Sequence, residues 1–134
     1  MISKVSKKYP RIKFRYLDTK SAFQHYLWGR KVSKKIKLRI NFTNNRSDVP
    51  NIKIKCISGK VFGPQPFLTI KLKNGRYLHD NLDFDIKKNI WHYAFHADTM
   101  SVKDVDCIGI ATNDKYGNTD IKRFKIQKNK IKFF

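Results

Sequence analysis

Apolar and basic residues alternate along several segments of this chain. Residues 36–42 read Ile-Lys-Leu-Arg-Ile-Asn-Phe, so that every second side chain is apolar. The same period recurs in residues 12–16, 52–56 and 68–72. Successive side chains of a strand point to opposite faces of a sheet, so this period is typical of half-buried antiparallel strands. We therefore predict four strands whose Lys and Arg side chains lie on solvent-exposed sheet faces.

Turn residues divide the rest of the sequence into further short segments. Asn-Gly at 74–75 and Gly-Asn at 117–118 predict two-residue hairpin turns, and Gly117 is expected at a positive φ, where a β-carbon is disfavoured. Gly-Pro-Gln-Pro at 63–66 excludes regular structure. The turns separate further predicted strands near 82–86, 90–96, 107–112 and 121–127.

One segment, from Asp18 to Trp28, has the features of a short helix. Asp18 or Thr19 is suited to accept hydrogen bonds from the first helical N–H groups, and Gly29 stands where a helix ends. At helical spacing the segment carries an apolar stripe, formed by Ala22, Phe23, Tyr26 and Leu27.

The length of 134 residues predicts one domain with enough core to fold without disulfides. Several short strands separated by turns predict an all-β fold, an antiparallel β-sandwich. We expect residues 1–48 to form basic strands and the short helix within the same domain, and residues 49–127 to form the sandwich. Residues 128–134 are expected to be a basic tail or an extra strand.

A series of motifs in residues 52–127 supports a more specific fold. In order, it comprises a Ser-Gly-Lys-Val step at 58–61, an alternating strand at 67–72, a Trp-aromatic strand at 91–95, a strand running into Asp-Lys-Tyr-Gly-Asn at 108–118, and a last strand at 122–126. This order resembles the immunoglobulin-like repeats of bacterial surface and phage structural proteins. The resemblance implies an immunoglobulin-like sandwich, in which residues 1–48 have no counterpart.

The net charge of the chain indicates the kind of partner that it binds. The chain has 30 Lys and Arg against 10 acidic residues, all of them Asp, which is a net charge of +20. Residues 1–60 carry 17 Lys and Arg against 2 Asp, a net charge of +15. A domain this basic repels itself, so the charge predicts a polyanionic partner, either nucleic acid or an acidic protein surface.

The candidate polyanion-binding residues lie on the predicted strands and around the helix. They are Lys34, Lys35, Lys37, Arg39, Lys53, Lys55, Arg11, Lys13, Arg15, Arg30 and Lys31. Aromatic side chains near them are candidates for stacking on unpaired bases, and these are Tyr9, Tyr16, Tyr26 and Trp28.

The cysteines and clustered polar residues indicate no metal site. Alternation places Cys56 on the core face and Cys107 on the opposite face, so we expect two free thiols. His92 and His96 share a strand face, but no second ligand pair at zinc spacing accompanies them. The acidic cluster of Asp80, Asp83 and Asp85 is expected to make ion pairs or a subunit contact rather than to bind calcium.

No motif of an enzyme is visible, and no cofactor is expected. The N-terminus lacks the apolar stretch of a secretory signal, and no apolar run reaches the ~20 residues of a membrane span, so we expect a cytoplasmic, organellar or virion-borne protein. The sequence predicts a non-enzymatic basic module that docks on nucleic acid within a larger assembly. The alternative is a phage virion or cell-surface structural or adhesion module, whose lysines pack against acidic neighbours.

Overall fold

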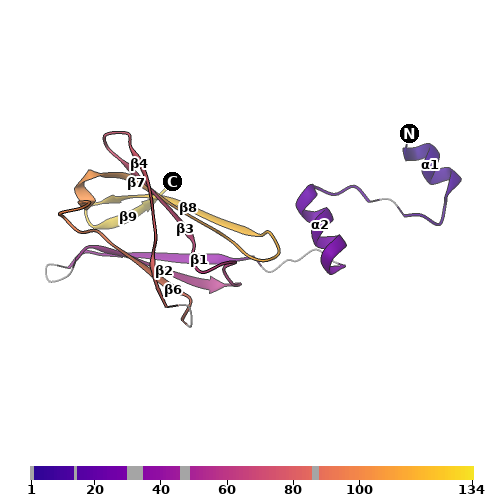
Figure 1. The fold of residues 1–134 in the computed structure, drawn as a ribbon. Coiled ribbons are helices and arrows are strands. Elements are labelled where there is room, and N and C mark those ends of the chain that lie inside the picture. Colours follow the sequence, from indigo (N-terminus) through magenta and orange to yellow (C-terminus); the bar gives the residue numbers. More distant parts are fainter. Residues whose placement is uncertain (1, 14, 30–34, 46–48, 86–87) are drawn as a thin grey trace. The chain divides into compact units, whose positions relative to one another are not determined.

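The computed structural model describes residues 2–13, 15–29, 35–45, 49–85 and 88–134. Its contacts divide the chain into two units, Met1–Val32 and Ser33–Phe134, and each is described by itself. The N-terminal unit is helical, whereas the C-terminal unit is built of strands (Figure 1).

The described residues of the N-terminal unit form two helices, α1 (Ile2–Lys8) and α2 (Thr19–Trp28). The predicted helix is confirmed as α2. Asp18 caps its start, because its carboxylate accepts hydrogen bonds from the Ser21 N–H (3.0 Å) and hydroxyl (2.6 Å). Gly29 ends it at φ 67 and donates its N–H to the His25 carbonyl. In α2, Phe23, Tyr26 and Leu27 are exposed, and the buried side chains are those of Ser21 and Gln24.

The strand predicted at 12–16 is wrong. The described residues there, 12, 13, 15 and 16, are in no strand, and Ile12 donates its N–H to the Tyr9 carbonyl (3.0 Å) in a turn that follows α1. A strand needs a partner, and the described strands pair only among residues 37–133. Helix α1 was not predicted, and it ends one residue before Tyr9-Pro10, where proline disfavours helical geometry.

In the C-terminal unit, the part of the chain that the structure describes forms two antiparallel sheets. The first has the order β1-β2-β6-β5, with β1 (Lys37–Thr43), β2 (Asn51–Ser58), β6 (Ile90–Ala94) and β5 (Asp83–Asp85). The second has the order β4-β3-β7-β8-β9, with β4 (Tyr77–Asp80), β3 (Phe67–Leu72), β7 (Val105–Asn113), β8 (Thr119–Gln127) and β9 (Lys130–Phe133). A short 3₁₀ helix, η2 (Val102–Asp104), precedes β7.

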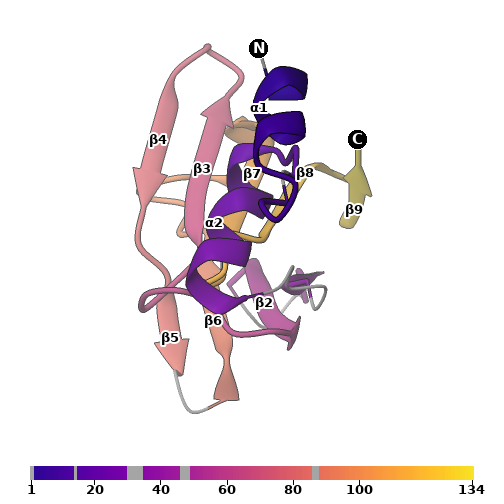
Figure 2. The ribbon, with the colours of Figure 1, turned by 90° about the vertical axis from the view of Figure 1, so that its right-hand side faces the viewer.

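The all-β prediction is therefore confirmed for this unit, including the strands predicted at 36–42, 52–56 and 68–72. Strand β1 belongs to the first sheet, and residues 130–133 form the extra strand rather than a tail. The chain passes from the second sheet to the first at Asn81 and Leu82, between β4 and β5 (Figure 2).

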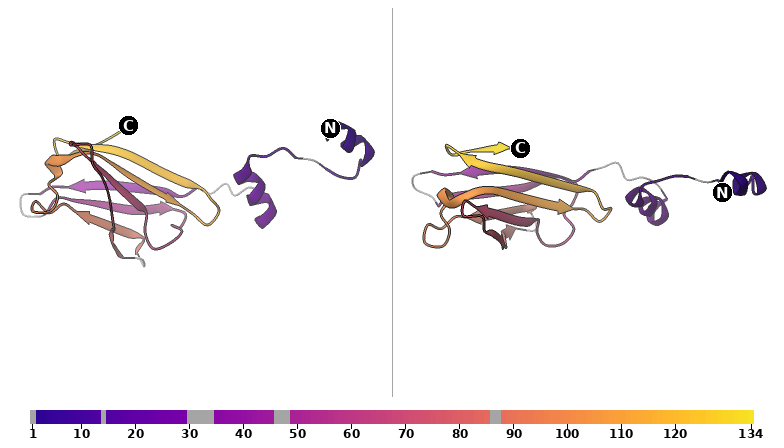
Figure 3. Two further views of the ribbon diagram at one scale, coloured as in Figure 1. Left: turned by 45° about the horizontal axis from the view of Figure 1, so that its top comes forward. Right: turned by 90° about the horizontal axis from the view of Figure 1, so that it is seen from above.

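The two sheets pack face to face around one hydrophobic core (Figure 3). The first sheet contributes Ile52, Ile54 and Trp91, and the second sheet contributes Ile108 and Phe124 among others. The Trp91 indole donates its N–H to the Pro64 carbonyl (2.9 Å), so this buried polar atom is satisfied. The alternating apolar residues of strands such as β1 and β2 therefore face the core, and the Lys and Arg residues between them face solvent.

Both predicted hairpin turns exist, but each loop has three residues rather than two. In the β3–β4 hairpin Leu72 donates its N–H to the Arg76 carbonyl, and Gly75 donates to the Leu72 carbonyl at φ 87. The β7–β8 hairpin repeats this geometry between Asp114 and Asn118, with Gly117 at the predicted positive φ, 75°. Glycine fills the left-handed position that follows the turn in three-residue loops.

The cysteines lie on the faces that alternation predicts, and both are free thiols. Cys56 is buried beside the core, and its thiol lies 3.2 Å from the Ser58 carbonyl. Burial raises the pKa of the Cys56 thiol. Cys107 neighbours the buried Ile108 in β7, so its side chain leaves the sheet on the opposite side, where it is half-buried.

Candidate polyanion-binding face and edge groove

The first sheet carries a row of cations on its outer face. In β1 the buried Leu38 and Ile40 alternate with exposed residues, and β2 repeats the pattern. The exposed cations Lys37, Arg39, Lys53 and Lys55 are here called the cationic face. These four are the sequence-predicted residues that the structure brings together. Lys35 is exposed two residues before β1, and Lys34 lies outside the described residues.

The register of β1 and β2 places Arg39 directly opposite Lys55. Side chains opposite one another on neighbouring antiparallel strands have Cβ atoms about 5 Å apart, and like charges there are destabilising. Among the described residues, no ion pair includes any of the four cations of the cationic face. The ion pairs found are Lys71–Asp106 (3.6 Å), Lys88–Asp85 (3.0 Å), Lys122–Asp120 (3.1 Å) and Lys125–Asp106 (2.7 Å).

In the second sheet, by contrast, cations form ion pairs with a neighbouring carboxylate. Lys71 of β3 and Lys125 of β8 share the carboxylate of Asp106 in β7. The hydrogen bond from Lys125 lowers the pKa of Asp106, and the charges of Lys125 and Lys71 act in the same direction. Among the described residues, the cationic face therefore has no counter-ion like the one that Asp106 provides in the second sheet.

The charge changes sign across the outer face of the first sheet, because β5 at its far edge is acidic. One row of paired residues runs through Arg39, Lys55, Ile90 and Asp85. The next row runs through Asn41, Lys53, His92 and Asp83. One edge of this face is therefore suited to bind anions and the other to bind cations.

Two residues of the acidic cluster, Asp80 and Asp85, make polar contacts with other side chains. Asp85 pairs with Lys88 (3.0 Å), as expected for a cluster of this kind. Asp80 accepts a hydrogen bond from the Tyr93 hydroxyl (2.9 Å). Burial, together with this bond, raises the pKa of Tyr93. Among the described residues, no group of three or more His, Cys, Asp or Glu side chains is placed to hold a metal ion.

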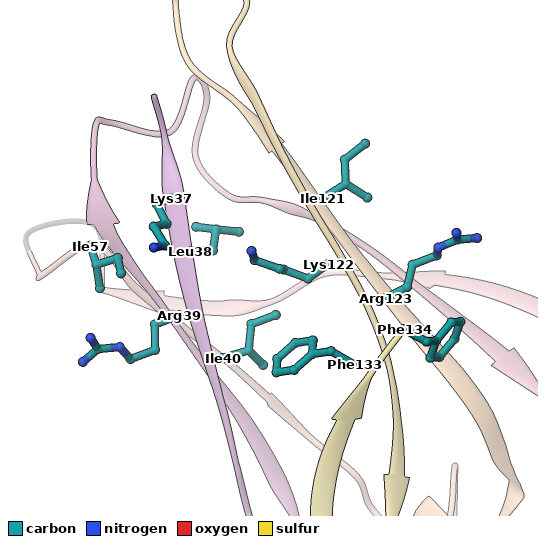
Figure 4. Close-up of a pocket in the computed structure, with 10 residues that line it drawn as sticks. All are labelled: Lys37, Leu38, Arg39, Ile40, Ile57, Ile121, Lys122, Arg123, Phe133 and Phe134. Carbon is teal, nitrogen blue, oxygen red and sulfur yellow. The ribbon is translucent and has the colours of Figure 1, made fainter. Parts of the chain in front are cut away.

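A groove of about 430 Å³ separates β1 from β8 and β9 (Figure 4). Hydrogen bonds connect its two sides. Asp120 of β8 accepts a hydrogen bond from the Leu38 N–H (2.7 Å), and the Asn44 side-chain amide donates to the Asn129 side-chain oxygen (2.7 Å). We call it the edge groove. Its cations and aromatic rings are Lys37, Arg39, Lys122, Arg123, Phe133 and Phe134.

The aromatic rings of the edge groove remain accessible. The Phe133 side chain is 52% exposed although its ring meets Phe124 edge-on, with the ring centroids 5.7 Å apart. Phe134 is also exposed, and the Arg123 guanidinium lies 5.8 Å from the centroid of its ring. Figure 4 shows the Phe133 ring beside Ile40 and the Lys122 side chain extending from β8 toward β1. The groove therefore combines positive charge with open apolar rings.

Four groove residues, Lys122, Arg123, Phe133 and Phe134, are absent from the set predicted from the sequence. The sequence places Lys122 and Arg123 in the strand predicted near 121–127, and it leaves residues 128–134 as a basic tail or an extra strand. Nothing local indicates that this strand lies beside residues 37–40, because that proximity depends on sheet order.

A second hollow, of about 770 Å³, lies beside the β7–β8 turn and is lined by residues 59–64 and 114–116. Lys60 and Lys115 contribute positive charge, and the Lys115 ammonium lies 5.0 Å from the centroid of the Tyr116 ring. The Asp114 carboxylate is buried and accepts hydrogen bonds from the turn itself. With two lysines and one aspartate in its lining, the hollow is less positive than the edge groove, which is lined by four cations. It lies where β2 ends and the Ser58 hydroxyl donates to the Lys35 carbonyl.

The other predicted binding residues belong to the N-terminal unit. Arg11, Lys13 and Arg15 are exposed, and the Arg15 guanidinium lies 3.2 Å from the His25 ring nitrogen. Arg30 and Lys31 lie outside the described residues. The aromatic candidates for stacking are all exposed, and they are Tyr9, Tyr16, Tyr26 and Trp28. The role of the N-terminal unit in binding a polyanion stays a prediction.

Comparison of the chain with protein-family models, with curated proteins and with solved structures found no match. The resemblance to immunoglobulin-like repeats therefore stays a prediction that rests on sequence motifs. Within the described helices, none has the length and apolar character needed to cross a bilayer. A functional conclusion must therefore rest on the residues of the site, since one fold can host many unrelated activities.

Proposed function

We propose that this protein is a non-enzymatic β module that binds nucleic acid through the cationic face, as one component of a larger nucleoprotein assembly. The observation that carries the proposal is the pairing of Arg39 with Lys55 on adjacent strands, without an anion beside either in the described structure. Such a pair is costly in the free protein and is relieved when a phosphate binds between the two cations.

The net charge supports the same partner. The chain carries +20 overall, which raises the local concentration of any polyanion and accelerates its association. If each of the four cations neutralises one phosphate, log affinity falls with log salt at a slope of about −3.6 on duplex or about −2.8 on single strands.

We further propose that the fold is immunoglobulin-like. The strand order supports this: β1-β2-β6-β5 matches the A-B-E-D sheet of that fold. In the same lettering β4-β3-β7-β8 corresponds to C′-C-F-G, and β9 extends this sheet by one strand.

The sign change across the first sheet favours a second candidate function, a virion or cell-surface structural module. The basic edge of one copy, at Arg39 and Lys55, has a complement in the acidic edge of another, at Asp83 and Asp85. Copies or related subunits would then pack edge to edge, and nucleic acid would not be needed.

A charge-matched pair of variants tests the proposed function. Arg39→Gln with Lys55→Gln removes two cations of the cationic face, and Lys73→Gln with Arg76→Gln removes two exposed cations from the β3–β4 hairpin. Fluorescence anisotropy with a labelled oligonucleotide measures affinity against salt concentration. The first variant should flatten the slope by about 1.8 on duplex or about 1.4 on single strands, whereas the control, which removes the same charge, should change it far less.

Two results would overturn the proposal: no binding at about 50 mM salt, or equal slopes for the two variants. Sedimentation at low salt then separates the alternative. Self-association that Asp83→Asn with Asp85→Asn abolishes would assign the face to protein assembly.

A further inference from the structure

The edge groove differs from the cationic face because it offers a flat apolar ring beside the charge. Phe133 is held in β9 by pairing with Phe124 of β8, and its ring is half open to solvent. Lys37 and Arg39 line the groove and also belong to the cationic face. A bound strand that follows the cations of this face therefore reaches the ring without leaving the positive field.

We propose that the edge groove binds a segment of single-stranded nucleic acid, with one unpaired base stacked on the Phe133 ring and neighbouring phosphates held by Lys37 and Arg39. This inference rests on the proposed function and names the form of nucleic acid that the site prefers. Bases stack on aromatic side chains in this way in proteins that bind single strands without sequence preference.

A duplex does not satisfy the same site, because its base faces are covered by the neighbouring base pairs. The volume of about 430 Å³ lies within the range of pockets that hold small ligands, which suits one base and not a helix. Cationic contacts to phosphates serve both forms of nucleic acid, whereas contact with the Phe133 ring serves only an unpaired base.

A peptide strand is a weaker fit to this groove. Strand addition requires free backbone donors along the sheet edge, and in β1 the Leu38 N–H already donates to Asp120. The groove is therefore better suited to a ligand that binds by stacking and by charge than to one that binds by backbone pairing.

The test compares two exposed phenylalanines on edge strands. Phe133→Leu removes the ring but keeps an apolar contact with Phe124. Phe84→Leu is the matched control, because Phe84 is 51% exposed on β5 and stands between Asp83 and Asp85. Anisotropy measures the affinity of each protein for labelled oligo(dT) of about 12 nucleotides and for a duplex of the same length.

We expect Phe133→Leu to weaken binding of oligo(dT) by about fivefold or more and to leave duplex binding unchanged, since a stacked base contributes about 5- to 150-fold in affinity. Phe84→Leu should change neither affinity. A measurement on the wild-type protein guards against a folding defect: oligonucleotides that contain 5-iodouracil should photocrosslink at Phe133, located by mass spectrometry.

The failures of the two proposals are distinguishable. Equal affinity for single strand and duplex, no effect of Phe133→Leu and no crosslink at Phe133 would overturn the groove assignment and leave the cationic face standing. Tighter binding of poly-glutamate than of oligo(dT) would assign the groove to an acidic peptide and would also overturn it. Absence of binding to both nucleic acids would remove the proposed function itself.

Discussion

Replacing Asp114 with alanine tests whether one buried carboxylate holds the β7–β8 turn together. Asp114 is 5% exposed, and one of its oxygens accepts hydrogen bonds from the N–H groups of Tyr116 (2.8 Å) and Asn118 (2.9 Å). The other oxygen accepts from the Asn118 side-chain amide (3.0 Å). Alanine removes these acceptors and leaves the donors in place, so the cost is that of unsatisfied buried groups.

The magnitude follows from the two buried donors of Asn118, which is 4% exposed. A hydrogen bond to a charged group contributes about 1.5–3 kcal/mol, and the N–H of Tyr116 is partly accessible to water. We expect Asp114→Ala to lower the free energy of unfolding by about 3–5 kcal/mol, a large part of the ~5–15 kcal/mol of a typical domain.

Urea unfolding, followed by the fluorescence of the buried Trp91, provides the assay. With a slope of about 2 kcal/mol per molar urea, the midpoint should fall by about 1.5–2.5 M. Asp114→Asn keeps the shape and one acceptor oxygen and should lie between wild type and Asp114→Ala. Asp98→Ala removes an exposed carboxylate and should stay within ~0.5 kcal/mol of wild type. Equal midpoints for Asp114→Ala and Asp98→Ala would show that the Asp114 carboxylate does not hold the turn together.

Three further predictions follow from local features. Gly117→Val should lower the free energy of unfolding by more than ~1 kcal/mol because φ is positive there, with Gly117→Asn less costly; an unchanged melting temperature would show that the turn geometry is different. Under denaturing, non-reducing conditions both thiols should titrate. In the folded protein Cys107 should react with an aromatic disulfide before Cys56, because Cys56 is buried and its thiol pKa is raised. The reverse order of reaction would contradict the assignment of the two cysteines to opposite faces. Because Lys125 lowers the pKa of Asp106, the stabilisation that this carboxylate provides is complete above its unfolded pKa, about 4, and is lost as the pH falls below it. Asp106→Asn should therefore reduce the fall in melting temperature between about pH 4 and pH 2, and an equal fall in both proteins would count against it.

Local sequence patterns predicted many elements of this fold correctly. Alternation identified the strands and assigned their faces, including the opposite sides on which Cys56 and Cys107 lie. The caps of α2 and the positive φ of Gly117 followed from residue chemistry within a few positions. These features depend on backbone sterics and on neighbouring residues, so a single sequence contains the information needed to predict them.

The same alternation misled at residues 12–16, where no described strand exists. The pattern there satisfies the period of a strand, but a strand also requires a partner with unpaired backbone groups. The loop lengths of the two hairpins were likewise misjudged by one residue, because Asn-Gly and Gly-Asn fit both two-residue and three-residue loops.

The composition of the chain and its alternation determined that Lys37, Arg39, Lys53 and Lys55 are exposed cations on sheet faces. The tertiary structure was needed to show that Arg39 stands opposite Lys55 and that no described acid lies between them. It also decided that Phe133 lines the same groove as Arg39, although 94 residues separate them in the sequence (133 − 39). Register and sheet order arise from the packing of the whole core, in which every strand competes for every partner, and no local pattern records the outcome of that competition.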